Sequence, residues 1–146
     1  MKTKTLWNAM AIAALSLSAL GASHTILAGG DRTRLECRDA SALQDASMKA
    51  RHEQDAGRAK FSVEIEVLPG GGLVAGDILE VHVGEALVGR ITLVQGPVDL
   101  GAELNFDTTA GPLDADSPFP ANFPAAVAPG TPVRIGAELG CSLQAR

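Results

Sequence analysis

The sequence predicts an all-β protein, an antiparallel β-sandwich of about seven strands with an Ig-like architecture. Apolar and polar residues alternate with a period of two along most of residues 46–143, which is the pattern of half-buried strands. Turns that contain glycine and proline separate these stretches at short intervals, as in sandwiches and barrels. Such short connections favour antiparallel pairing, because parallel strands need long crossovers.

The clearest expected strand covers residues 61–67, where apolar residues alternate with glutamate and serine. Residues 55–58 before it are expected to form a hairpin turn, since glycine takes a positive φ without steric cost. Residues 39–50 have a helix-forming composition, but the alternation through residues 46–52 favours a turn followed by a strand. The other expected strands cover about 35–37, 46–52, 79–83, 87–93, 98–106 and 132–143.

Two of these strands carry specific expectations about side-chain direction. In the strand at 98–106, the alternation places Val98 and Leu100 on the inward face. The last strand is expected to run unbroken over residues 132–143, with Ala137 and Cys141 among its inward residues.

Residues 1–28 have the features of a secretory signal peptide. Lys2 and Lys4 precede an apolar run over residues 6–20, and small residues follow it, which is the order of a signal sequence. The run is shorter than the roughly 20 residues that cross a bilayer as a helix. We therefore expect cleavage, a secreted or periplasmic protein, and no membrane span after processing. Residues 29–146 then form a single domain, in keeping with the usual domain length.

Cys37 and Cys141 are the two cysteines of the chain, and they are expected to form a disulfide. An exported protein enters an oxidising compartment, and the wide spacing does not suit a C-x-x-C redox or metal motif. Both cysteines fall on the inward register of their strands, so the bridge is expected inside the domain. Closing so long a loop contributes about 4–5 kcal/mol in the chain-entropy model.

The chain is acidic, with seventeen acidic and twelve basic residues. Two of the basic residues lie in the expected signal peptide, so binding to nucleic acid through charge alone is disfavoured. Tyrosine is absent and the single tryptophan, Trp7, also lies in the signal, which removes residues that are common at interface hot spots. The sequence leaves open which protein or surface partner the domain binds and in which oligomeric state it acts.

Residues 107–131 form a long segment without any period, and five of the eight prolines lie in it together with Phe119 and Phe123. Prolines stiffen such a segment by fixing φ, and aperiodic loops of this length are uncommon and often functional. Two interpretations stay open: the phenylalanines cap an open end of the sandwich, or they form an exposed patch that contacts a partner. The cap is favoured, because a secreted monomer rarely exposes such a patch.

The Phe106-Asp107-Thr108 triplet, the PFPANFP sequence of residues 118–124 and a final strand with a cysteine resemble small exported bacterial β-domain proteins of unknown function. The resemblance spans most of the mature chain. It implies the β fold, and it brings no activity, cofactor or catalytic residue with it.

Motifs for catalysis are absent from the sequence, and we expect the protein not to be an enzyme. His52 is expected at the edge of an inward register and His82 on an outward face, so the two do not form an evident metal pair. No serine lies in a nucleophile-elbow motif. The glycine run at 70–72 opens no helix, as a phosphate-binding loop would.

Calcium is the one specific cofactor hypothesis, set against the expectation that no cofactor binds. Asp107, Asp114 and Asp116 occur together at the start of the long loop, and calcium takes about six to eight oxygen ligands from such loops. The spacing matches no EF-hand, and aspartate is common at turns because it bonds to its own backbone.

Taken together, the residues favour a secreted or periplasmic, non-catalytic binding or structural β-domain whose ligand is not identified. Two alternatives stay open. One is a calcium-dependent adhesion or assembly module, and the other is a small secreted enzyme with no recognisable motif.

Overall fold

The computed structural model describes residues 32–40, 45–70, 72–112 and 114–146. The expected signal peptide, residues 1–28, lies outside these described residues. Within them the chain forms strands and no helix, so no membrane-spanning helix occurs there either. The strands are β1 (Thr33–Asp39), β2 (Ala46–Asp55), β3 (Arg58–Val67), β4 (Ile78–Val83), β5 (Ala86–Thr92), β6 (Val94–Gln95), β7 (Leu100–Asp107), β8 (Pro132–Ile135), β9 (Leu139–Ser142) and β10 (Gln144–Ala145).

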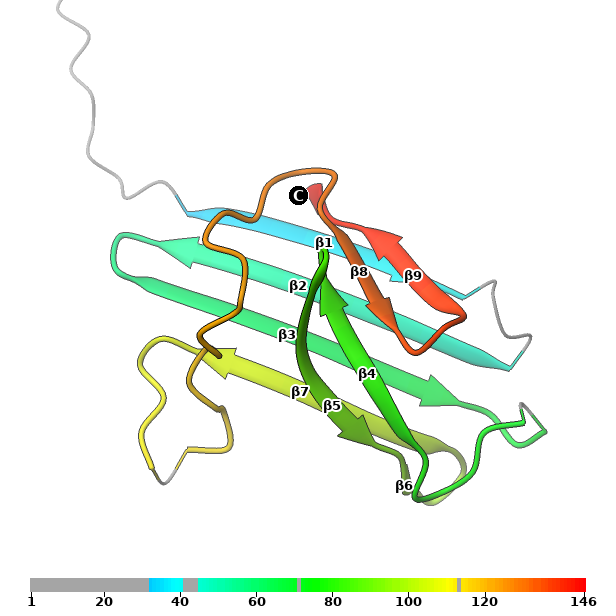
Figure 1. Cartoon of the computed structure of the whole chain (residues 1–146). Coiled ribbons are helices and arrows are strands. Elements are labelled where there is room, and N and C mark those ends of the chain that lie inside the picture. The colour runs from blue at the N-terminus through cyan, green and yellow to red at the C-terminus, as the bar shows by residue number, and fades with distance from the viewer. Residues whose placement is uncertain (1–31, 41–44, 71, 113) are drawn as a thin grey trace, which may run out of the picture.

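The strands form two antiparallel sheets that pack against each other, as Figure 1 shows. The larger sheet has six strands in the order β10-β1-β2-β3-β7-β6, and the smaller has four in the order β5-β4-β8-β9. Every ladder between the described strands is antiparallel. The predicted antiparallel sandwich is therefore confirmed, while the Ig-like assignment stays a prediction.

The hairpin of β2 and β3 forms the centre of the larger sheet. Its two strands pair from Ala46↔Val67 to Asp55↔Arg58, and the turn lies where the sequence predicted it. Alternate side chains of both strands are buried, because they meet the smaller sheet across the core. The residues from 46 onward form β2, which confirms the preference for a strand over a helix; residues 41–44 lie outside the described residues. The buried apolar core comprises Leu35, Ala46, Met48, Ala50, Phe61, Val63, Ile65, Val67, Val81, Val83, Val88, Ile91, Leu93, Phe106, Val133, Ile135, Leu139 and Leu143.

The expectation of one unbroken strand over residues 132–143 is wrong. The segment is a hairpin, in which β8 and β9 pair from Pro132↔Ser142 to Ile135↔Leu139. Gly136 turns the chain with a φ of 60°, a left-handed conformation that glycine adopts without steric cost. Ala137 is consequently exposed at the turn rather than inward. The apolar alternation continues through a three-residue turn, so the pattern alone does not reveal the break.

Val98 was also expected to point inward, and this expectation is wrong. Its side chain is 74% exposed, because β7 begins at Leu100 and residues 96–99 form the turn that precedes it. Within that turn the amide of Gly96 donates to the carbonyl of Asp99 at 2.7 Å. The short strand β6 before the turn was not predicted either.

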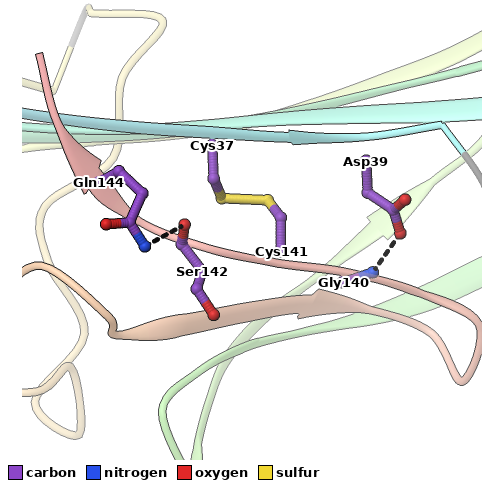
Figure 2. Close-up of a disulfide and its surroundings, with 6 residues drawn as sticks. All are labelled: Cys37, Asp39, Gly140, Cys141, Ser142 and Gln144. Carbon is purple, nitrogen blue, oxygen red and sulfur yellow. Dashed lines mark hydrogen bonds between the residues drawn. A yellow bond between two sulfur atoms is a disulfide. The ribbon is translucent and has the colours of Figure 1, made fainter.

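The predicted disulfide between Cys37 and Cys141 is confirmed. It joins β1 of the larger sheet to β9 of the smaller sheet, across 104 residues of sequence, with the two Cα atoms 5.8 Å apart. Figure 2 shows the bridge between the two strands, with the amide of Gly140 donating to the carboxylate of Asp39 nearby at 3.1 Å. Both cysteines are half-buried and pack against the core, in keeping with their inward register.

Candidate functional site

The described residues of the proline-rich loop, 107–112 and 114–131, fold back over one end of the sandwich. All four phenylalanines of the chain meet there: Phe61 and Phe106 from the sheet, and Phe119 and Phe123 from the loop. The ring centroids of Phe119 and Phe123 lie 4.6 Å apart in an edge-to-face arrangement, and that of Phe123 lies 5.3 Å from Phe61. Aromatic pairs favour such geometries. The two loop phenylalanines are half-buried against the core, as a cap requires.

Backbone hydrogen bonds also fix this loop to the sheets. The amide of Ser117 donates to the carbonyl of Asn105, and the amide of Asp107 donates to the carbonyl of Ser117. On the other side, the Asn122 side chain donates to the carbonyl of Leu87 in β5. Because β5 is an edge strand of the smaller sheet, this bond covers part of an edge that could otherwise pair with another chain. In Figure 1 the loop runs from the end of β7, passes in front of β3 and β2 in this view, and leads to β8.

A pocket of about 240 Å³ lies between this loop and the β2–β3 hairpin. We call it the cap pocket. Seven of its ten lining residues are apolar, and none of the ten carries a carboxylate, an ammonium or a guanidinium group. The lining residues are His52, Gln54, Ala59, Thr108, Phe119, Pro120, Phe123, Pro124, Ala125 and Val127.

His52 is the buried polar residue of the cap pocket. It lies on the inner face of β2, opposite Leu35 on one side and Phe61 on the other, and is 4% exposed. Its ring stacks on Phe123 with a centroid distance of 6.5 Å and an interplanar angle of 18°. Burial lowers the pKa of His52 below its ordinary value, because desolvation disfavours the charged imidazolium. The ring is therefore neutral at pH 7.

The Nδ1 atom of His52 has no hydrogen-bond partner, and it is the one buried side-chain nitrogen or oxygen among the described residues in this condition. A buried polar group without a partner costs about 1–3 kcal/mol, so native structures usually satisfy such groups. Since the His52 ring belongs to the lining of the cap pocket, a ligand or a water molecule bound there is the natural source of a hydrogen-bond partner for this ring.

Larger hollows lie on the outer face of the six-stranded sheet. One of about 380 Å³ is lined by residues that include Arg38, Lys49 and Glu64, and another of about 280 Å³ by residues that include Glu53 and Lys60. Both linings are rich in charged side chains and neither includes His52. We take the cap pocket as the candidate site, because it alone among these hollows is lined by uncharged residues and includes His52, the residue with the unpartnered buried nitrogen.

Of the three aspartates of the calcium hypothesis, Asp107 and Asp116 share a contact with Lys60, and Asp114 contacts the backbone of its own loop. Asp107 is 2% exposed, and its Oδ2 lies 2.5 Å from Nη2 of Arg58 and 3.0 Å from Nζ of Lys60. Its Oδ1 accepts hydrogen bonds from the amide and the hydroxyl of Thr109. The hydrogen bond from Arg58, followed by the one from the Thr109 amide, holds the pKa of Asp107 well below its ordinary value.

The other two aspartates make fewer contacts than Asp107. Asp114 accepts a hydrogen bond from the amide of Gly111, and Asp116 lies 3.7 Å from the same Nζ of Lys60 that contacts Asp107. Across residues 32–40, 45–70, 72–112 and 114–146, no three His, Cys, Asp or Glu side chains are grouped so that they could hold a metal ion. Calcium binding by these residues stays a prediction.

A second buried carboxylate, Glu36, ties the C-terminus to the larger sheet. It lies on the outer face of β1 and contacts the guanidinium groups of Arg34, Arg51 and Arg146. The hydrogen bond from Arg34 is the largest of the causes that lower the pKa of Glu36 to about 2. The amide of Arg146 also donates to the carbonyl of Arg34 at 3.1 Å. This cluster holds the last residues of the chain in place.

Comparisons of the chain with protein-family models, with curated proteins and with solved structures found no match. The sequence indicated the loop, its two phenylalanines and the inward register of His52. It gave no sign that Gln54, Ala59 and Thr108 line the same pocket, since that follows from how the loop crosses the hairpin.

Proposed function

We propose that this chain is an exported, non-catalytic binding domain and that the cap pocket is its binding site. The observation that carries the proposal is that His52, whose buried Nδ1 has no partner, lines a pocket together with phenylalanines and prolines. Ligand pockets are typically apolar concavities with a few polar groups that orient the ligand. At about 240 Å³ the cap pocket is smaller than the roughly 300–1,000 Å³ of typical ligand pockets, which suits a small molecule or a single side chain.

The surroundings of His52 support binding over catalysis. A histidine that acts as a general base is oriented by a hydrogen-bonded partner, commonly a carboxylate. Desolvation is the cause of the lowered pKa of His52, and none of the other residues that line the cap pocket is charged. A neutral imidazole in an apolar wall is suited to accept or donate one hydrogen bond to a ligand.

Export is supported by the features of residues 1–28 and by the disulfide between Cys37 and Cys141. Disulfides persist in oxidising compartments. Expression of the full chain in a host with a periplasm should yield a shortened, oxidised protein in that compartment. An unprocessed chain in the cytoplasm with two free thiols would contradict export.

A matched pair of substitutions in the loop tests the binding site. Ala125 lines the cap pocket, and its neighbour Ala126 does not; both are exposed. The variant Ala125→Trp places a large side chain at the pocket, and Ala126→Trp adds the same side chain beside it. Amide chemical shifts are recorded by NMR while p-cresol, cyclohexanol, N-acetylprolinamide or glucose is added.

We expect at least one of these probes to shift the amides of pocket residues in the wild type and in Ala126→Trp. The same probe should bind at least about tenfold more weakly to Ala125→Trp, because the indole occupies its space. If none of the probes acts on the pocket amides, or if both tryptophan variants respond as the wild type does, the pocket is not a binding site.

A further inference from the structure

We infer that the cap pocket takes a single uncharged aromatic ring that carries a hydroxyl group, that is, a phenol. This inference rests on the proposed function, since it names the ligand class of the same site. It is carried by three features of the pocket: its volume, the chemistry of its walls, and the free hydrogen-bonding capacity of His52.

The volume fits one ring with a small substituent. An apolar cavity of about 150 Å³ holds a benzene molecule, and the cap pocket measures about 240 Å³. The remaining space accommodates a hydroxyl and a methyl group, but a fused system of three rings would exceed it. A larger ligand could place only one ring in the pocket.

The walls favour an aromatic ring over an aliphatic group. Phe119 and Phe123 meet edge to face with their centroids 4.6 Å apart, and the imidazole of His52 is stacked on Phe123. A flat guest can extend this set of ring contacts, which contribute about 0.5–1.5 kcal/mol for each pair beyond the burial of area. Pro120 and Pro124 also belong to the lining.

The polar lining favours a hydroxyl and excludes a charge. A neutral imidazole has one N–H donor and one acceptor nitrogen, and a hydroxyl can pair with either of them. It therefore matches His52 whichever nitrogen carries the proton. A carboxylate or an ammonium group would lose its hydration in the pocket without gaining an ion pair, since no lining residue is charged.

Two sources could supply this ring: a free phenolic small molecule and the side chain of a tyrosine in a peptide. The shared chemistry is the phenol, and the experiment separates the sources. p-Cresol is the side-chain analogue of tyrosine, and the peptide N-acetyl-Gly-Tyr-Gly-amide presents the same ring on a backbone.

The test measures binding to the exported, oxidised protein by NMR, with p-cresol, toluene, benzoate and the tyrosine peptide as probes. Toluene differs from p-cresol only by the hydroxyl, and benzoate carries a charge. We expect p-cresol to bind in about the millimolar range that suits so small a ligand. Toluene should bind at least about tenfold more weakly, because it leaves His52 unpaired, and benzoate should not bind.

Substitution of the histidine completes the test. His52→Phe keeps a flat ring in the core and removes both nitrogens, so p-cresol and toluene should then bind equally. His82→Phe is the matched control, since His82 lies on β4 and does not line the pocket; it should keep the full preference for p-cresol. If His52→Phe fails to fold, the relative affinities of the wild-type protein for p-cresol and toluene still test the phenol assignment.

Each outcome has a defined meaning. Binding of p-cresol alone, or of both p-cresol and the tyrosine peptide with p-cresol the stronger, supports a free phenolic ligand. Stronger binding of the peptide supports a phenol site that receives a tyrosine side chain. Equal binding of toluene and p-cresol, or tighter binding of benzoate, overturns the phenol assignment and leaves the pocket as a binding site. The proposed function is overturned as well if no probe shifts the amide resonances of the pocket residues, either in this titration or in the one that includes the tryptophan variants.

Discussion

At the scale of single residues, His52 shows how the period of a strand places a polar side chain in the core. Its register on β2 follows from Ala46, Met48 and Ala50, which occupy the same face. The sequence predicts this inward position but not its consequence. The loop stacks Phe123 on the imidazole and leaves Nδ1 without a partner, and no local pattern in the sequence signals that contact.

Burial of His52 predicts a pH dependence of stability. Because burial lowers the pKa of His52, the unfolded chain takes up a proton near its ordinary pKa of about 6.5 before the folded chain does. The free energy of unfolding should therefore fall as the pH falls through this range. His52→Phe should lack this component, and urea denaturation between pH 8 and pH 5 measures the difference.

His82→Phe serves as the matched histidine substitution, since His82 lies on β4 and does not line the cap pocket. Parallel profiles for the wild type and His52→Phe would show that the imidazole is solvated in the folded protein, contrary to its burial beneath the loop.

Asp107 offers a second test at the residue scale. Its carboxylate is held by Arg58, Lys60 and Thr109, so Asp107→Asn should lower the melting temperature at pH 7. The lowered pKa of Asp107 means that this stabilisation is present above the ordinary aspartate pKa of about 3.9 and is lost as the pH falls below it. The gap between wild type and variant should therefore narrow in acid.

The variant Asp114→Asn is the matched control, because Asp114 is exposed and its carboxylate accepts a hydrogen bond from the Gly111 amide within the same loop. Thermal melts of both variants at pH 7 and pH 3 check the expectation. If Asp107→Asn melts no lower than Asp114→Asn at pH 7, the ion pairs of Asp107 do not hold the loop.

At the scale of elements, the strands were predictable because each shows its own inward face. Strand β3 is the clearest case, since its four core residues alternate with glutamate and serine. The failures have a common physical cause. In β8 and β9 the alternation passes through a three-residue turn without a change of phase, and Val98 continues the pattern of β7 into a turn where no sheet covers it.

The loop is the element on which the candidate site depends. Its prolines and two phenylalanines predicted a cap, and the structure places both rings against Phe106, with Phe123 also against Phe61. The pocket beneath it was not predictable, because it depends on pairing between segments that are distant in the sequence. Ala59 and Thr108, for example, line the pocket only because the loop crosses the β2–β3 hairpin beside them.

The ring contacts predict unequal effects for the two loop phenylalanines. Phe123 contacts His52, Phe61, Phe106 and Phe119, whereas Phe119 contacts Phe106 and Phe123. Phe123→Ala should therefore lower the free energy of unfolding by about 2–4 kcal/mol, and Phe119→Ala by less. Urea denaturation measures both values, and a larger loss for Phe119→Ala would show that the rings are arranged differently.

At the scale of the whole molecule, the disulfide joins the two layers of the sandwich. Cys37 and Cys141 belong to different sheets and are 104 residues apart, so the bridge closes a loop that includes most of the described chain. The sequence predicted the pairing because only two cysteines exist and both have an inward register. It did not predict that the bridge would connect the two sheets rather than neighbouring strands of one sheet.

Loss of this bridge should reduce stability without changing the fold. The double variant Cys37→Ser, Cys141→Ser is expected to lose up to about 4–5 kcal/mol of unfolding free energy, the chain-entropy value for so long a loop. Urea denaturation of the variant, and of the wild type with and without dithiothreitol, measures the effect. A wild type whose midpoint does not change on reduction would show that the bridge does not constrain the unfolded chain.

The cap pocket and its proposed ligand both require that the proline-rich loop closes one end of the sandwich over the imidazole of His52. Proton–proton nuclear Overhauser effects in the oxidised protein report on this closure without any substitution. We expect cross-peaks from the ring protons of Phe123 to those of His52 and Phe61. A loop whose phenylalanine rings show no cross-peaks to either residue would contradict the cap, the pocket and the function assigned to it.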